Sequence, residues 1–214
     1  YKKISYTQNI IENFRNSITA NERDFGAAYY PWLNTRVVQS SELSETNLIA
    51  ESLTLVQGKP EFKDTLEIII EKLNVLPPAS AMAGVYTMVD EVRGVWKSPA
   101  NVSINSVVSP SVNISENEQD DLTVPLDGKT VNAIRSFPGQ GVLVWGARTL
   151  KGNSQDWRYI NVKRTMIMLE QSIKNDFDTY VIALNDQNTK EAIKNTIEDF
   201  LTNLWKKGAL VGPI

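Results

Sequence analysis

The sequence predicts a mixed α/β (α+β) fold in which helices pack on a sheet. In roughly the last 80 residues, apolar patterns alternate in the order strand, helix, strand, helix, which is typical of an α/β layer. Two apolar runs at 131–137 and 141–150 flank a Pro-Gly turn signal, and we expect them to form the core of the sheet.

The N-terminal third predicts two helices with an aromatic strand between them. Apolar residues recur at helical spacing over 4–20 and again over 62–73. Residues 25–30 combine small and aromatic side chains and end at Pro31, which is typical of a short strand. The polar stretch 39–61 indicates neither a helix nor a strand clearly.

The next predicted helix covers 79–92. Pro77 and Pro78 favour its start, because proline is tolerated in the first turn of a helix. One face of this helix carries small residues and is expected to pack closely against a neighbour; it consists of Ala79, Ala83 and Gly84.

Short segments separate this helix from the sheet core. Pieces with β-like composition occur at 102–108 and 112–114. An acidic run follows at 116–121, which we predict to be a solvated surface loop. Asp127 and Gly128 then indicate a turn.

The C-terminal third predicts two long helices. An apolar stripe indicates the first, from about 157 to 177; its members are Val162, Met166, Leu169, Ile173 and Phe177. A short buried strand is expected at 180–184. Asn188 or Thr189 is expected to cap the final helix, and Gly208 to end it.

The composition narrows the function. The chain has 214 residues, 42% of them apolar and 22% charged, which is typical of a soluble globule. A net charge of −3 argues against broad nucleic-acid binding, and no apolar run reaches the length of a membrane span. The sequence contains no Cys and no His, so thiolate chemistry, disulfides and the commonest general base are excluded. These absences argue against an enzyme.

The glycines near the sheet core do not predict a phosphate-binding loop. Gly139 and Gly141 are followed by the apolar run 142–145, which is a strand, whereas a dinucleotide fingerprint needs a helix there. The stretch is better interpreted as a turn that leads into a strand.

Two acidic groups have ordinary interpretations. The run 116–121 lacks the glycine and terminal glutamate of a calcium-binding loop. Asp90 and Glu91, close to Arg93 at a predicted helix end, are most simply a surface salt bridge. We predict no metal site and no cofactor.

An alternative function is an α/β enzyme or ligand-binding module with a site near Arg148, which stands at a predicted strand end. Because no nucleophile, base or cofactor loop accompanies it, we favour a structural network of arginines, aromatic residues and one aspartate. The network consists of Trp96, Arg135, Trp145, Arg148, Asp156, Trp157 and Arg158.

Lys206 and Lys207 end the last predicted helix and have two interpretations. Positive charge is favourable near a helix C-terminus, which explains them without a partner. A contact with an acidic partner explains them equally well.

Several long runs resemble the contractile tail sheath proteins of phages and of phage-tail-like injection systems, in the family's order. They are Ala27–Trp32, Pro77–Tyr86, Asp90, Arg93–Asn101, Asn132–Leu150, Trp157–Arg164 and Phe200–Leu210. The resemblance covers about 25 to 210, nearly the whole chain, which makes it specific. Residues 39–75 match least and are expected to be a variable insertion in one assembly domain that covers 1–214.

The resemblance implies a structural function without catalysis. Sheath subunits stack as rings, usually hexameric, around an inner tube, and they contract to drive the tube through a target envelope. The implied partners are other copies of the chain, linked by strand-exchanging arms, the inner tube protein, and baseplate and tail-terminator proteins. The implied location is a phage tail or injection particle that is assembled in the bacterial cytoplasm.

The resemblance also bears on the two ends of the chain. The final helix is similar to the part of the family that faces the tube, which makes Lys194, Lys206 and Lys207 candidate tube contacts. Family members usually continue well past Gly208 and begin before this N-terminal helix. The sequence is therefore expected to be part of a sheath subunit, without its linking arms.

Overall fold

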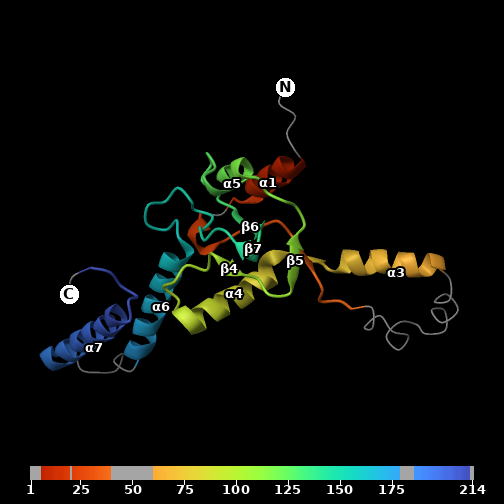
Figure 1. Ribbon diagram of the computed structural model, residues 1–214. Helices are drawn as coiled ribbons and strands as arrows, with labels where there is room; N and C mark the ends of the chain where they lie inside the picture. Colours follow the sequence, from red (N-terminus) through yellow and green to blue (C-terminus); the bar gives the residue numbers. More distant parts are fainter. Residues whose placement is uncertain (1–5, 20, 40–59, 179–185, 213–214) are drawn as a thin grey trace.

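The computed structural model describes residues 6–19, 21–39, 60–178 and 186–212. Figure 1 shows a central sheet with helices above and below it, one helix projecting to the right, and two helices extending to the lower left. The mixed α/β class that the sequence predicts is confirmed.

The main sheet has four strands in the order β1-β6-β7-β4. Their bounds are Tyr29–Tyr30 for β1, Val102–Ser103 for β4, Asn132–Phe137 for β6 and Gly141–Val144 for β7. β6 and β7 form an antiparallel hairpin, β4 pairs antiparallel with β7, and β1 is parallel to β6. The two predicted core strands therefore do lie at the centre of the sheet.

The glycine pair forms the hairpin turn, as predicted. Phe137 pairs with Gly141, and the Gln140 amide donates to the Phe137 carbonyl at 3.1 Å. Gly139 and Gly141 have φ of +76° and +77°, in the left-handed region that glycine adopts without strain. The motif is therefore the turn of the β6–β7 hairpin.

The second strand of the hairpin is shorter than predicted, ending at Val144 and not at residue 150. The buried Asn132 side chain explains this end, because it accepts from the Arg148 amide and donates to the Arg148 carbonyl, both at 2.8 Å. The Asn132 side chain thus makes the hydrogen bonds to the Arg148 backbone that a neighbouring strand would otherwise make. Gly146 leaves the space, since a Cβ there would lie 2.8 Å from the Asn132 amide oxygen.

A smaller antiparallel sheet has the order β3-β2-β5, with β2 at Leu33–Thr35, β3 at Val75–Leu76 and β5 at Val107–Pro110. The strand expected over 25–30 is mostly wrong. Its first residue, Phe25, is the last residue of the short 3-10 helix η1, Arg23–Phe25, and only Tyr29–Tyr30 forms a strand. Residues 112–114 are likewise outside any strand.

Helices cover both faces of the main sheet. α4, Pro78–Arg93, packs Met82, Val85 and Val89 against one face. α1, Tyr6–Ser17, and α5, Glu116–Thr123, cover the other. The alternation of side chains along a strand explains the two layers, because consecutive Ala133 and Ile134 are both fully buried in different clusters.

The acidic run 116–121 is a helix, so the predicted loop is wrong. Ser115 caps α5 by accepting from the Glu118 amide, and the Glu118 carboxylate accepts from the Ser115 amide at 2.9 Å. This reciprocal pair is a capping box, and carboxylates in the first turn favour the helix dipole. The Ser-x-x-Glu spacing was available in the sequence.

The small face of α4 is also placed differently from the prediction. Ala79, Ala83 and Gly84 are exposed in the chain, and a Cβ added to Gly84 would meet nothing within 4 Å. No close packing of this face against a neighbour exists within the described residues.

The two C-terminal helices are α6, Ile160–Phe177, and α7, Gln187–Lys206. The cap of α7 is Asp186, which accepts from the Thr189 amide at 2.8 Å, and not Asn188 or Thr189. Gly208 does end α7: its amide bonds to the Trp205 carbonyl and the Ala209 amide to the Leu204 carbonyl. The predicted strand 180–184 lies outside the described residues.

Helix α3, Pro60–Leu73, projects from the body and confirms the predicted helix over 62–73. Its apolar residues Ile68, Ile69 and Leu73 are exposed. In the part of the chain that the structure describes, no helix has the length and apolarity to span a membrane.

Candidate functional site

The strongest concentration of charged and aromatic contacts lies where α6 begins. There α6 meets η1, β1 and α4, all of which lie far from α6 in the sequence. We call this cluster the charged junction, and it consists of Asp24, Tyr29, Tyr86, Asp90, Lys163 and Arg164.

Lys163 connects α6 to η1. Its Nζ lies 2.8 Å from Oδ2 of the buried Asp24, and 3.7 Å and 4.6 Å from the ring centroids of Phe25 and Trp157. The hydrogen bond from Lys163 lowers the pKa of Asp24 below its ordinary value. Lys151 adds a longer ion pair at 3.7 Å. The Lys163 ammonium group is thus held by the Asp24 carboxylate and by two aromatic rings.

Arg164 connects α6 to α4. Its two terminal nitrogens donate to the two Asp90 carboxylate oxygens at 2.8 Å and 2.5 Å, a bidentate pair in which both side chains are partly buried. The hydrogen bonds to Asp90 raise the pKa of Arg164. Asp90 therefore pairs across helices, and the expected surface salt bridge with its sequence neighbour Arg93 is wrong.

Two tyrosines complete the junction. The Tyr29 and Tyr86 hydroxyl oxygens are 2.7 Å apart, and their rings meet edge-on with centroids separated by 6.5 Å. The Arg164 guanidinium lies 4.8 Å from the Tyr86 ring centroid. Burial raises the pKa of both hydroxyls, so both stay neutral and serve as hydrogen-bonding groups.

The junction is arranged to hold elements together. Each charge faces an opposite charge, and consecutive residues of one helix turn reach two different elements. A hydrogen bond to a charged group contributes about 1.5–3 kcal/mol. Among the described residues, no cluster of His, Cys, Asp and Glu is suited to hold a metal ion. The geometry favours mechanical coupling of α6 to α4 and β1.

The residues of the predicted structural network occupy separate places. On the hairpin, Arg135 donates to Gln119 at 2.6 Å and lies over the Phe137 ring, which packs on Trp145 with centroids 4.6 Å apart. Trp145 is 38% exposed, so it covers the hairpin and is not part of the core.

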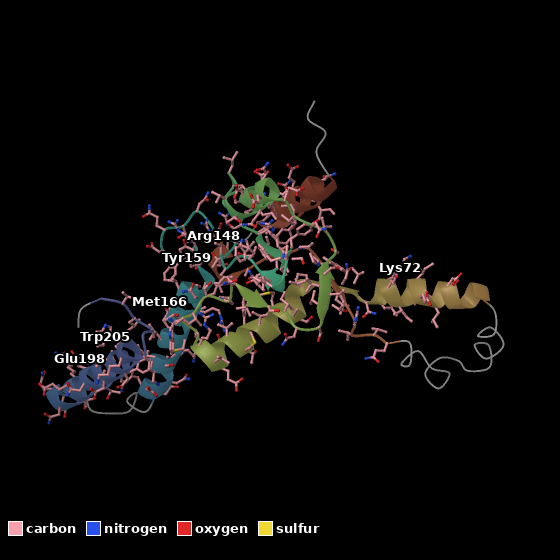
Figure 2. All side chains as sticks on the ribbon, viewed as in Figure 1. Lys72, Arg148, Tyr159, Met166, Glu198 and Trp205 are labelled. Atoms are coloured by element: carbon pink, nitrogen blue, oxygen red, sulfur yellow. The ribbon has the colours of Figure 1, made fainter. Side chains whose placement is uncertain are left out.

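A second group lies at the base of α6. The guanidinium groups of Arg148 and Arg158 approach the Tyr159 ring at 5.8 Å and 5.9 Å, and Figure 2 shows Arg148 and Tyr159 together there. Arg158 also donates to the Ser154 carbonyl. Asp156 is exposed and takes part in none of the salt bridges among the described residues. This arrangement gives no support to a catalytic site at Arg148.

The two remaining tryptophans border the junction. Trp157 contacts Lys163, and its carbonyl accepts from Thr149 at 2.6 Å. The Trp96 carbonyl accepts from Asn161 on α6, while its indole nitrogen is buried without a hydrogen-bond partner among the described groups. The structural role expected of the seven residues stays a prediction.

The candidate tube contacts lie on α7. Lys206 and Lys207 are exposed at the end of the helix, and Lys194 is exposed with a 3.6 Å ion pair to Glu198. Figure 2 shows Glu198 and Trp205 on α7, well away from Arg148 and Tyr159. Their role in tube binding also stays a prediction.

Sequence reasoning did not single out Tyr29, Tyr86, Lys163 and Arg164 as a site. All four lie within the runs that carry the family resemblance, which was the signal available. Asp24 lies just before the first of these runs, so the resemblance gave no signal for it. Their convergence requires the fold, because α6 brings together partners that are 74 and about 140 positions away in the sequence.

Comparisons with known proteins agree on one family. A family model described as the phage tail sheath C-terminal domain matches residues 153–212. The tail sheath protein of Vibrio phage KVP40 is 28% identical over 138 residues, which is 63% of this chain and 20% of that protein. The chain thus spans about a fifth of the length of this curated relative.

Solved structures are similar over more of the chain. The sheath complex of an extracellular contractile injection system, PVC, in the contracted state is 31% identical with a TM-score of 0.74, over 98% of this chain and 48% of that one. The contracted helical sheath of the anti-feeding prophage is 41% identical with a TM-score of 0.59, over 64% of this chain and 38% of that one.

Proposed function

The chain belongs to the contractile tail sheath family, and from that premise we propose that it is part of a structural sheath subunit. Copies polymerise as stacked rings around an inner tube and contract to drive the tube through a target cell envelope. The observation that carries the proposal is the similarity to the PVC sheath, which extends over 98% of the chain at a TM-score of 0.74.

In this function the charged junction acts as a rigid coupling. Contraction exchanges one set of contacts between subunits for another, so each subunit has to move as a body. Lys163 and Arg164 tie α6 to η1 and α4, and α6 leads toward α7. A displacement that reaches α6 is therefore transmitted to the sheet and not absorbed at the start of α6.

The partners follow from the same proposal. Neighbouring copies form the rings, and the baseplate forms one end of the particle, in line with the similar chain in the anti-feeding prophage baseplate. The inner tube protein and a tail-terminator protein are further proposed partners. The particle is a phage tail or a related injection system, assembled in the bacterial cytoplasm.

We propose Lys194, Lys206 and Lys207 as the tube contact, because they are exposed cations on α7 and at its C-terminal cap. Reversing Lys206 and Lys207 to Glu is expected to lower tube binding by about tenfold or more, since rim charges govern association. Co-sedimentation of the full-length subunit with tube protein measures this. Reversal of Lys72, exposed on the distant α3, is the control. Unchanged tube binding in the double variant would exclude this assignment.

Electron microscopy tests the proposal as a whole. The full-length subunit, expressed with its tube protein, is expected to form striated cylinders. Soluble monomers alone, across a range of salt concentrations and with tube protein present, would contradict a sheath function.

A further inference from the structure

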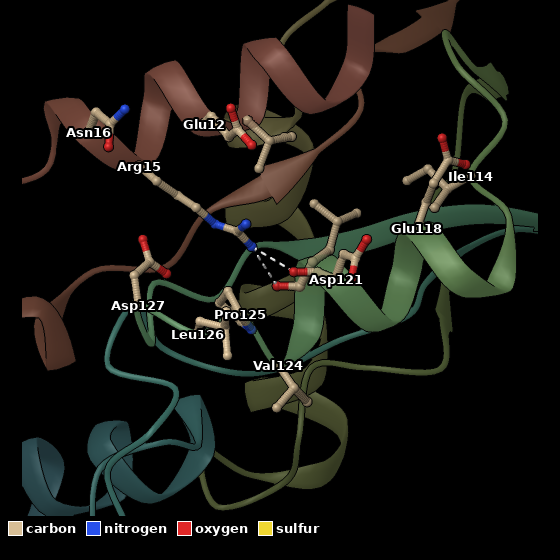
Figure 3. A pocket seen from close by; sticks show the side chains of 12 residues that line it. Glu12, Arg15, Asn16, Ile114, Glu118, Asp121, Val124, Pro125, Leu126 and Asp127 are labelled. Atoms are coloured by element: carbon tan, nitrogen blue, oxygen red, sulfur yellow. Dashed lines mark hydrogen bonds between the residues drawn. The ribbon is translucent and has the colours of Figure 1, made fainter. Parts of the chain in front are cut away.

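A groove of about 460 Å³ lies between α1, α5 and the segment that follows α5. Figure 3 shows Arg15 reaching from α1 across this groove toward α5. Its guanidinium donates to the carbonyls of Asp121 and Leu122 at 2.9 Å and 3.2 Å, in the last turn of α5. Arg15 therefore holds the two walls together and is not available to a ligand.

The groove combines an apolar surface with two carboxylates that make no hydrogen bond among the described residues. Ile11, Ile114 and Leu122 are its buried apolar residues, and Val124 and Leu126 are exposed beside them. Glu12 on α1 and Asp121 on α5 stand on opposite walls (Figure 3). Within the described parts of the chain, neither side chain makes a hydrogen bond or salt bridge, but both charges act on the Arg15 guanidinium and oppose the lowering of its pKa by burial.

Two other carboxylates of the groove are already used by the fold. Glu118 caps α5 through Ser115, and Asp127 accepts from the Lys129 amide at 3.0 Å. Arg15 is the one cation among the residues that line the groove, and its charge is shared by Glu12, Asp121 and Asp127, so the groove keeps a net negative charge. A segment that fits must carry positive charge close to apolar side chains.

The C-terminal end of α4 has this composition. We call it the α4 tip, and it consists of Met88, Val92, Arg93 and Lys97. Val92 is 75% exposed, Met88 is exposed on the same side of the helix, and both cations are exposed. Arg93 and Lys97 form no salt bridge with any residue that the structure describes. Glu91 is the one exposed carboxylate beside them.

The two surfaces cannot meet within one molecule. Figure 1 shows α1 and α5 at the top of the chain, whereas α4 ends at the lower left. Two different complementary surfaces on one chain give a head-to-tail contact, which produces closed rings or helical filaments. This is the kind of contact that a stacked-ring polymer requires.

We propose that the α1/α5 groove of one copy binds the α4 tip of a second copy, with Glu12 and Asp121 facing Arg93 and Lys97. Val92 and Met88 then cover the apolar groove and its exposed Val124 and Leu126. The proposal rests on the proposed sheath function and names one of the contacts between subunits.

Charge reversal on the full-length subunit with its tube protein tests this contact. The groove variant is Glu12→Lys with Asp121→Lys, and the tip variant is Arg93→Glu with Lys97→Glu. Each is expected to reduce the polymerised fraction about tenfold or more, and the combination to restore most of it, because opposite charges then face each other again. Sedimentation and electron microscopy measure the fraction.

A matched control reverses Glu22 and Glu170 to Lys, which are exposed, lie outside both surfaces and give the same change in net charge as the groove variant. If either variant forms tubes as well as the wild type does, the proposed contact is wrong, but the sheath function is unaffected. Two weakened variants without recovery in the combination overturn the α4 tip as the occupant. A wild type that forms no tubes overturns the proposed function, and the contact with it.

Discussion

The main sheet and the projecting helix α3 differ in how far their apolar side chains are buried. In the sheet, Ile134 is fully buried between β7 and α4. In α3, Ile69 is 43% exposed, although the helix has a regular apolar stripe. Figure 2 shows Lys72 on this helix, far from the labelled residues of α6 and α7.

The difference shows which region is stabilised by burial within one chain and which leaves apolar side chains exposed. Burial of an apolar side chain contributes about 1.5–3 kcal/mol, so the sheet region gains its stability within one chain. In α3, by contrast, Ile68, Ile69 and Leu73 are only partly covered by the residues that the structure describes, so they gain less of this stabilisation. In a polymer, such a surface is where contacts between molecules add stability.

The largest expected effect is in the sheet. Ile134→Ala is expected to lower the free energy of unfolding by about 2–5 kcal/mol, because it leaves a cavity in a closed core. Chemical denaturation of the purified protein measures the change. A loss below about 1 kcal/mol would mean that the two faces of β6 are not packed as described.

Arg164→Ala tests the junction. It removes both hydrogen bonds to Asp90 and leaves that carboxylate partly buried without its partner. The expected loss is about 1.5–3 kcal/mol of unfolding free energy. Arg93→Ala is the matched control, since Arg93 is exposed and close to Asp90 in sequence. Equal effects of the two variants would contradict a specific role for the bidentate pair.

Lowering the pH is expected to have a smaller effect on the free energy of unfolding, through the protonation of Asp24. Its pKa in the folded state lies below the ordinary value of 3.8, so the ionised form stabilises the fold. This contribution is complete above pH 3.8 and is lost as the pH falls through the lowered pKa. The difference in unfolding free energy between wild type and Asp24→Asn should therefore shrink on acidification. A constant difference from about pH 6 to pH 3 would show that the carboxylate is not preferentially ionised in the folded state.

The sequence predicted most where the structure depends on local signals. The hairpin around Gly139, the helix opened by Pro78 and the end of α7 at Gly208 follow from short-range backbone preferences. The helix at 116–121 was missed because its charge was weighed more heavily than its capping box. That error was avoidable from the sequence.

Other features depend on tertiary contacts and were not available from sequence spacing. The Asn132 side chain ends β7 at Val144 by bonding Arg148, which only the folded hairpin brings within reach. The pairing of Arg164 with Asp90 needs α6 to cross α4. The family resemblance identified the segments that matter, but not which side chains within them meet.

The smallest expected effect on the isolated chain is in α3. Ile69→Ser is expected to change the free energy of unfolding by less than about 0.5 kcal/mol, because the residue lies on the surface and outside the buried clusters. If α3 is covered in the polymer, the same variant should reduce assembly of the full-length subunit, which sedimentation measures. Asp64→Ser, on the exposed polar side of α3, is the control. A large loss of stability in Ile69→Ser would mean that α3 packs against its own chain, and the contrast with the sheet would disappear.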